Sequence, residues 1–271
     1  MEEIWIQLDM EASKQQQRTY IDPQSGYRVF TTYGLLQRRN CCGCGCRHCP
    51  FGHREVSDEY RQKIRQNPWI EGDTGNSDTF DVVSWSGGKD SYLAVRALQR
   101  ENQRPILLMT TFDGITQKVA HQEVTLSMIK QQAQSLQLPI LLIPLYSQHP
   151  YLTRIEQGLT LLLQTHRIHR LVFGDLHLDY IRSWRERELN ILMTEYDFGL
   201  HFPLWNVAYP ELMKDLKNAG VHCTISAIAD ESCKNVLEIG DIFDETLMEK
   251  LPQRVDTFGE NGEFHTYVSF E

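Results

Sequence analysis

The stretch that decides the fold runs from Phe80 to Ser91 and reads Phe-Asp-Val-Val-Ser-Trp-Ser-Gly-Gly-Lys-Asp-Ser. A short apolar run ends in a Ser-Gly-Gly-Lys-Asp-Ser turn, and a helical pattern starts at Tyr92. Two glycines let a polyphosphate approach the backbone, and the start of a helix directs unpaired N–H groups and the positive end of its dipole at the same place. We therefore expect a phosphate-binding loop. Its spacing is not the Gly-x-x-x-x-Gly-Lys-Ser/Thr of kinases and GTPases.

Strand and helix patterns alternate after this loop. Unbroken apolar strands that alternate with helices are typical of a parallel sheet covered on both faces. The sequence therefore predicts an α/β doubly wound sheet, whose ligand binds beyond the carboxyl ends of the strands. The expected strands are 80–85, 105–111, 139–144, 170–174 and 222–228, and the expected helices are 91–101, 120–137, 149–166, 178–193 and 207–219.

The loop at Ser86–Ser91 resembles the pyrophosphate-binding (PP) loop of the ATP pyrophosphatases, in the adenine nucleotide alpha hydrolase superfamily. Further motifs resemble the diphthine-ammonia ligase family in the same order, over about residues 80–270. These motifs are Phe173-Gly174-Asp175-Leu176, Tyr180 to Glu186, Pro203-Leu204-Trp205 and Gly259-Glu260-Asn261-Gly262-Glu263-Phe264-His265-Thr266. The resemblance implies a Rossmann-like ATP-binding domain at 79–199 and an α+β acceptor-substrate subdomain at 200–271.

The same resemblance implies an ATP-dependent ligase. Such an enzyme adenylates a carboxylate acceptor with release of pyrophosphate, and ammonia or an amine then displaces AMP to form an amide. The family substrate is diphthine, and ATP and Mg²⁺ are the implied cofactors.

Three sets of candidate residues follow from the motifs and the resemblance. The catalytic set is Lys89, Asp90, Asp175, Glu260 and Glu263. The ATP-binding set is Ser86, Gly87, Gly88, Lys89, Asp90, Ser91, Phe112, Asp113 and Gly174. The substrate-binding set is Tyr180, Arg182, Arg185, His265 and Thr266.

Each set has a structural alternative. A carboxylate such as Asp90 can simply stabilise a helix N-terminus. Arg182 and Glu186, four residues apart, can pair on a solvated helix face. Two carboxylates on one tight turn repel, so either Glu260 or Glu263 can have a raised pKa and accept a proton from an incoming amine, although an exposed acidic turn is the plainer interpretation.

Five of the seven cysteines fall between residues 41 and 49, in a Cys-rich module expected at 18–66. This segment resembles a small domain of unknown function. Cys42, Cys46 and Cys49 have the spacing that can hold three irons of a [4Fe-4S] cluster, and with His53 they can equally form a zinc site. Unligated thiols are the third possibility. We expect residues 1–17 to be a frayed lead-in, a short helix at 58–66 and a flexible linker at 67–78.

Composition narrows the class of protein. The chain has 271 residues, 41% of them hydrophobic, and a formal net charge of -9. Residues 1–66 hold 10 Lys/Arg and 8 Asp/Glu, and residues 67–271 hold 17 Lys/Arg and 28 Asp/Glu. An acidic body disfavours broad binding of nucleic acid, although a local basic face can hold an RNA. No apolar run is long enough for a membrane helix and the start is acidic, so we expect a cytoplasmic protein without a membrane partner.

Two alternative functions stay open from the sequence. One is a tRNA-modifying enzyme of the thiolation type, which adenylates a base before sulfur attacks and would use the Cys-rich module for RNA or sulfur. The other is a module that binds ATP without turnover.

Overall fold

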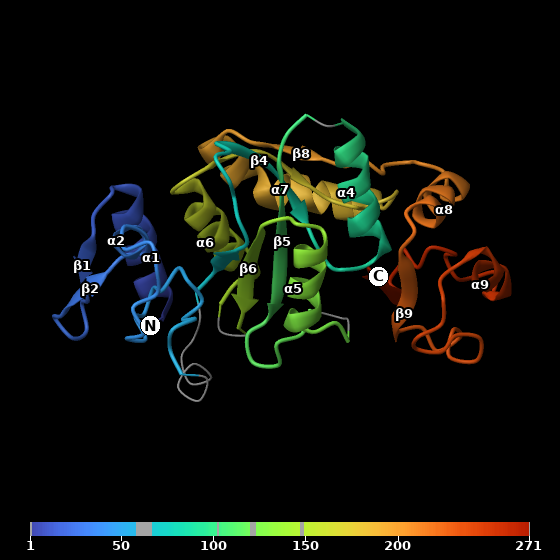
Figure 1. The fold of residues 1–271 in the computed structure, drawn as a ribbon, viewed down its shortest axis with the longest axis horizontal. Helices are drawn as coiled ribbons and strands as arrows, with labels where there is room; N and C mark the ends of the chain where they lie inside the picture. The colour runs from blue at the N-terminus through green and yellow to red at the C-terminus, as the bar shows by residue number, and fades with distance from the viewer. Residues whose placement is uncertain (1, 58–66, 102, 120–122, 147–148, 271) are drawn as a thin grey trace.

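A six-stranded sheet forms the centre of the molecule (Figure 1). The structure is a computed structural model that describes residues 2–57, 67–101, 103–119, 123–146 and 149–270. The strand order is β3-β6-β5-β4-β7-β8, with β3 antiparallel to β6 and the other neighbours parallel. The strands are β3 (Trp69–Glu71), β4 (Thr79–Ser84), β5 (Ile106–Asp113), β6 (Ile140–Leu145), β7 (Arg167–Val172) and β8 (Gly199–His201).

Helices cover both faces of this sheet. Alternate residues of β4 point to opposite sides, so Val83 joins one apolar cluster and Val82 the other. The first cluster includes side chains of α4 and α5, and the second includes side chains of α6 and α7. The helices are α4 (Lys89–Glu101), α5 (Leu126–Ser135), α6 (Tyr151–Leu163) and α7 (Asp179–Tyr196). The predicted α/β class and its four main helices are confirmed.

Strand order places a topological switch point beside β4. The chain moves outward from β4 to β5 and β6, and then returns to the other side of β4 to form β7. The loops after β4 and β7 therefore leave the sheet side by side at its carboxyl edge. Ligands of open α/β sheets bind in the crevice at such a point.

One predicted strand of the parallel sheet is wrong. Residues 222–228 do form a strand, β9 (His222–Ile228), but it pairs with β10 (Phe264–Ser269) as a separate antiparallel hairpin. The edge strand is instead the short β8, which pairs with β7. An apolar run indicates a buried strand but does not indicate its partner. Helices α8 (Tyr209–Asn218) and α9 (Glu245–Lys250) flank the hairpin.

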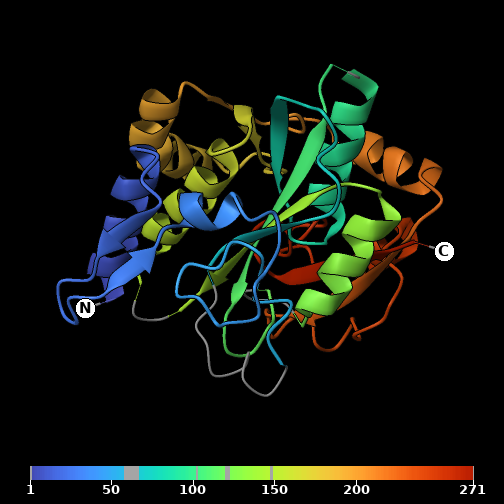
Figure 2. The ribbon, with the colours of Figure 1, turned by 60° about the vertical axis from the view of Figure 1, so that its left-hand side comes forward.

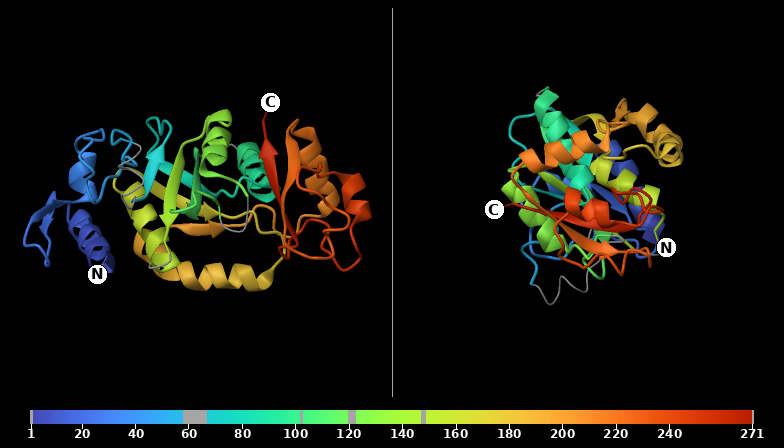
Figure 3. Two further views of the ribbon diagram at one scale, coloured as in Figure 1. Left: turned by 90° about the horizontal axis from the view of Figure 1, so that it is seen from below. Right: turned by 90° about the vertical axis from the view of Figure 1, so that its right-hand side faces the viewer.

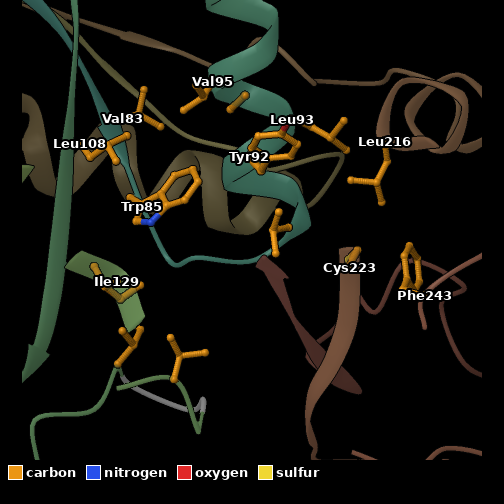
Figure 4. Close-up of a cluster of buried hydrophobic side chains, with 14 of the residues drawn as sticks. Val83, Trp85, Tyr92, Leu93, Val95, Leu108, Ile129, Leu216, Cys223 and Phe243 are labelled. Atoms are coloured by element: carbon orange, nitrogen blue, oxygen red, sulfur yellow. The ribbon is translucent and has the colours of Figure 1, made fainter. Parts of the chain in front are cut away.

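The hairpin shares its core with the sheet. Cys223 of β9 and Phe243 belong to the same buried cluster as Trp85 at the end of β4 and Leu93 of α4 (Figure 4). Because this cluster is continuous, the C-terminal segment is fixed against the loop that follows β4.

The N-terminal module contains more regular structure than expected. Residues expected to fray form α1 (Glu2–Lys14), since Ile6, Asp9, Met10 and Ser13 are buried on one helix face. Strands β1 (Thr19–Ile21) and β2 (Arg28–Phe30) make a small antiparallel hairpin, and α2 (Thr32–Leu36) follows. Part of the expected linker is strand β3 of the main sheet. The helix predicted at 58–66 lies outside the described residues.

The three parts lie in a row, with the N-terminal module and the β9–β10 hairpin at opposite ends (Figure 3). The module rests beside α6 and α7 (Figure 2), where Lys14 forms an ion pair of 2.7 Å with Glu195. In the part of the chain that the structure describes, no helix is long and apolar enough to cross a bilayer.

Candidate active site

The loop between β4 and α4 is shaped by its two glycines. Gly87 has a φ of +83°, in the left-handed region that side chains disfavour. A Cβ at Gly88 would lie 2.9 Å from the Thr266 carbonyl oxygen. Ser86 and Ser91 bond within the loop, since the Ser86 hydroxyl accepts from the Gly88 N–H at 3.4 Å and the Ser91 hydroxyl donates to the Gly88 carbonyl at 2.9 Å.

Two distant segments hold this loop in place. The Val268 N–H of β10 donates to the Gly87 carbonyl at 2.9 Å, and the Lys89 N–H donates to the Thr266 hydroxyl at 3.0 Å. Gln132 of α5, 1% exposed, donates from Nε2 to the Gly87 carbonyl and accepts from Trp85 Nε1 at 3.0 Å. Thr266 was predicted to bind substrate, but it is buried and its hydroxyl contacts the loop backbone. Nothing in the sequence around Gln132 indicates its role.

Lys89 and Asp90 form an ion pair of 2.8 Å at the start of α4. The Lys89 side chain is 4% exposed, and its ammonium lies 5.2 Å from the Phe258 ring centre. The Oδ1 atom of Asp90 is buried and has no hydrogen-bond partner in the structure. Burial raises the pKa of Asp90, Lys89 opposes the rise, and the nearby carboxylates of Asp175 and Asp256 add to it.

The segment after β7 reaches the same place. A Cβ at Gly174 would lie 2.6 Å from the Asp90 carbonyl oxygen, so only glycine fits this approach. Asp175 accepts two hydrogen bonds from Arg185, at 2.6 and 3.0 Å. The Leu176 N–H donates to Glu260 Oε1 at 2.8 Å. The predicted Lys89, Asp90, Asp175 and Glu260 therefore gather at the switch point, from three separate parts of the sequence.

Glu260 has a strongly perturbed environment. Burial raises its pKa to about 7, the Leu176 N–H and Lys89 oppose the rise, and the carboxylates of Asp90 and Asp175 add to it. A carboxyl group with such a pKa exchanges protons near neutral pH, as a general acid or base must. The neighbouring Glu263 is not a cause of this shift, although the sequence suggested mutual repulsion on the turn.

The Glu263 side chain forms hydrogen bonds within its own loop. It is 8% exposed and accepts from the Asp256 N–H at 2.8 Å and from Asn261 Nδ2 at 3.2 Å. Its Oε2 atom is buried without a hydrogen-bond partner in the structure. Glu263 therefore organises the loop that carries Glu260, and its predicted catalytic role stays a proposal.

Sequence reasoning missed Tyr209, Asp256 and His177. The Tyr209 hydroxyl donates to Asp256 Oδ2 at 2.7 Å and lies 3.4 Å from His177 Nδ1. Burial and the bond to Asp256 raise the pKa of Tyr209, so the phenol stays protonated. Its ring stacks on Phe258 at 4.3 Å. A Tyr at a helix start and an Asp in a loop are too common to indicate a site.

Two predicted ATP-binding residues lie at the end of β5. The ring of Phe112 is completely buried and meets Trp69 edge-on at 5.7 Å, so it packs in the core. Asp113 accepts from the Ile115 and Thr116 N–H groups, which lowers its pKa and shapes the turn after β5.

The predicted substrate residues on α7 are spread along the helix. Tyr180 is 66% exposed. Arg182 pairs with Glu186 at 2.9 Å on a solvated face, as the plainer interpretation expected, and its guanidinium lies 4.9 Å from the Trp205 ring centre. Arg185 is paired with Asp175. His265 lies in β10 opposite Ala227, next to Thr266.

The cysteines form two pairs. The sulfurs of Cys42 and Cys46 are 3.3 Å apart, and those of Cys41 and Cys49 are 3.8 Å apart. His53 Nε2 is 2.8 Å from the Cys46 carbonyl oxygen, and its side chain is buried. Within the described ranges no three side chains of His, Cys, Asp or Glu are grouped so as to hold a metal ion. Zinc or iron-sulfur binding by Cys42, Cys46, Cys49 and His53 stays a prediction.

The mostly parallel sheet and the glycine loop after β4 are consistent with a Rossmann-like PP-loop fold. Residues 81–190 match the family model described as "Diphthamide synthase N-terminal domain". Residues 8–55 match a family of unknown function, DUF5522. The resemblance seen in the sequence is thus confirmed for the loop, β4 to α7, and the module.

A solved structure is also similar to the chain. It is described as a predicted subunit of tRNA methyltransferase from Methanocaldococcus jannaschii. The two are 17% identical, the match covers 70% of this chain and 96% of the other, and the TM-score is 0.38.

Proposed function

We propose that the protein is an ATP-dependent amide ligase resembling diphthine-ammonia ligase. A carboxylate oxygen of the acceptor attacks the α-phosphorus of ATP, the bond to the β-phosphate oxygen breaks, and pyrophosphate leaves. Ammonia then attacks the acyl-adenylate carbonyl, AMP departs with the acyl oxygen, and one proton is lost from nitrogen. The observation that carries the proposal is the convergence of Lys89, Asp90, Asp175 and Glu260 beside the glycine loop at the switch point.

The loop is suited to hold pyrophosphate. Gly87 and Gly88 leave no side chain over the backbone, and α4 begins at Lys89 with its positive dipole end directed at the loop. Lys89 supplies a full positive charge that can neutralise the leaving group. Little covalent chemistry is required of the protein, since positioning and charge stabilisation dominate phosphoryl and adenylyl transfer.

Asp90 fits an Mg²⁺ site. Its buried Oδ1 atom has no partner, and carboxylate oxygen is the ligand that this hard cation prefers. The oxygens of Asp175 are engaged by Arg185, so Asp175 fits a more distant role, through water or by orienting Arg185. When bound, Mg²⁺ would neutralise phosphate charge.

Glu260 is placed for proton transfer in the second step. With a pKa raised to about 7, it can take the proton that nitrogen loses as the amide forms. Its backbone partner Leu176 fixes one oxygen at the edge of the site. Tyr209 donates its single O–H to Asp256, so its neutral oxygen is left as an acceptor.

The test is a product analysis with a matched pair of variants. Purified protein receives ATP, Mg²⁺, ammonium and a diphthine-bearing protein as acceptor, and AMP and pyrophosphate are measured together with amide formation by mass spectrometry. Lys89→Met keeps the apolar stem in its buried place and should lower AMP release by about 100-fold or more. Lys217→Met, at an exposed lysine of α8, should have no effect.

Other products would select the alternatives. AMP formed with tRNA but with no carboxylate acceptor would replace the proposal with the tRNA-modifying function. ATP binding by calorimetry without turnover on any acceptor would leave the non-catalytic module. Normal AMP release from Lys89→Met would show that the assigned loop is not the site.

A further inference from the structure

The outer face of the β1–β2 hairpin is unusually apolar and cationic for a surface. Residue pairing in the hairpin sets Ile21 opposite Arg28 and Thr19 opposite Phe30, so Ile21, Arg28 and Phe30 share one face. Ile21 is 57% exposed and Phe30 is 42% exposed. The other face, with Tyr20, packs inward. We call the set Ile21, Tyr27, Arg28, Phe30 and Arg38 the hairpin face.

An arginine extends this face beyond the hairpin. The guanidinium of Arg38, which follows α2, lies 4.4 Å from the Phe30 ring centre. Tyr27, next to Arg28 and 76% exposed, adds a second aromatic side chain at the turn. The face therefore offers two exposed rings and a guanidinium that stacks on one of them.

The segment from residue 18 to residue 39 carries mostly positive charge. Residues 18–39 contain four arginines and a single acidic residue, Asp22. The side chain of Asp22 is 2% exposed and is engaged by Trp5, Ser25 and Arg47. The four arginines are Arg18, Arg28, Arg38 and Arg39, and each of them is exposed. Within the described part of the chain, none of them has an ion-pair partner. Among the described residues, the exposed arginines of this segment are therefore not neutralised by ion pairs.

This combination fits single-stranded nucleic acid. Arginine binds phosphate through its planar fork and stacks on aromatic rings, and unpaired bases stack on exposed aromatic side chains. All four cations here are arginines. An acidic protein partner would need the charge but not the two exposed rings. Folded RNAs display unpaired bases in loops and ends, where most RNA recognition takes place, whereas DNA is mostly paired.

We propose that the hairpin face binds single-stranded RNA. Residues 67–271 hold 17 Lys/Arg and 28 Asp/Glu, and this acidic body disfavours broad binding of nucleic acid, so we expect the RNA contact at this end of the molecule. This proposal is independent of the amide-ligase function, because it concerns a surface at the opposite end from the β9–β10 hairpin and needs no ATP.

The test is fluorescence anisotropy of the full chain with a labelled, unstructured 12-nucleotide RNA at several salt concentrations. Phe30→Ala should weaken binding about fivefold or more with an unchanged salt slope, because a stacking contact is lost. Arg28→Ala should weaken binding and reduce the salt slope by about 0.7, as expected for one phosphate contact to a single strand. Arg104→Ala, at an exposed arginine before β5, removes the same charge and should leave binding unchanged.

Two further comparisons keep the result decisive. Arg38→Lys retains charge but loses the planar stack, so it should weaken binding while thermal unfolding stays unchanged. In separate experiments, duplex RNA, single-stranded DNA or polyglutamate is added as a competitor of the labelled RNA. The proposal is overturned if the wild-type chain does not bind the RNA, if Arg104→Ala weakens binding as much as Arg28→Ala, or if polyglutamate or DNA competes as well as RNA.

Discussion

Glu260 is the residue whose protonation should be visible in stability. An ordinary glutamate has a pKa near 4.5, and burial raises that of Glu260 to about 7. At a pH between these two pKa values, Glu260 is therefore protonated in the folded chain and ionised in the unfolded chain. The free energy of unfolding should fall as pH rises from about 4.5 to about 7, by on the order of 2 kcal/mol, and stay level above.

Glu260→Gln tests this assignment, because glutamine keeps the bond from the Leu176 N–H but does not titrate. Relative to wild type, the variant should gain stability between pH 5 and pH 8 in urea unfolding. Asp90 titrates in both proteins, so most of its contribution cancels in the comparison. An equal stability difference at the two pH values would mean that the pKa of Glu260 is not raised.

At the scale of elements, Gln132 couples α5 to the loop and to β10. Its side chain bonds to the Gly87 and Val268 carbonyls and accepts from Trp85. Gln132→Leu would remove the acceptor of the buried Trp85 Nε1–H group, while the Gly87 carbonyl keeps its bond from the Val268 N–H. A buried group left unsatisfied costs roughly 1–3 kcal/mol. We expect a lower urea midpoint together with weaker ATP binding by calorimetry.

A control separates the two effects of that change. Gln134→Leu alters an exposed glutamine of the same helix and should change neither property. If Gln132→Leu lowered stability but left ATP affinity unchanged, Gln132 would be a core residue without influence on the loop.

At the scale of the whole molecule, Asn67 joins the module to the main domain. Its Nδ2 atom donates to the Arg47 carbonyl at 2.7 Å, and its Oδ1 atom accepts from Gln157 of α6 at 3.2 Å. Asn67→Ala removes both bonds at a buried position, so the module should open more often than the rest of the chain.

Hydrogen exchange measures that opening. In Asn67→Ala, amides of α2 and of residues 41–49 should exchange faster by about tenfold, since about 1.4 kcal/mol corresponds to a factor of ten, while β4 and β5 keep their protection. Asn218→Ala, at an exposed residue of α8, should exchange like wild type. A uniform increase over the whole chain would contradict a separate opening of the module.

The sheet class, the glycine loop and most of the helices can be predicted from the amino-acid sequence. These follow from local patterns: apolar runs of strand length, helical periodicity, and two glycines before a helix start. The sequence also led us to predict that Lys89, Asp90, Asp175 and Glu260 belong to one site, because their motifs resemble those of a known family.

Contacts between distant segments are seen in the three-dimensional structure alone. It paired β9 with β10 outside the sheet, turned residues expected to fray into α1, and set Gln132 and Thr266 against the loop. It also separated Glu260, at the switch point, from Glu263, which holds its own turn. The physical reason is that burial and pairing depend on which segments meet, and a pattern within one segment does not specify its partner in space.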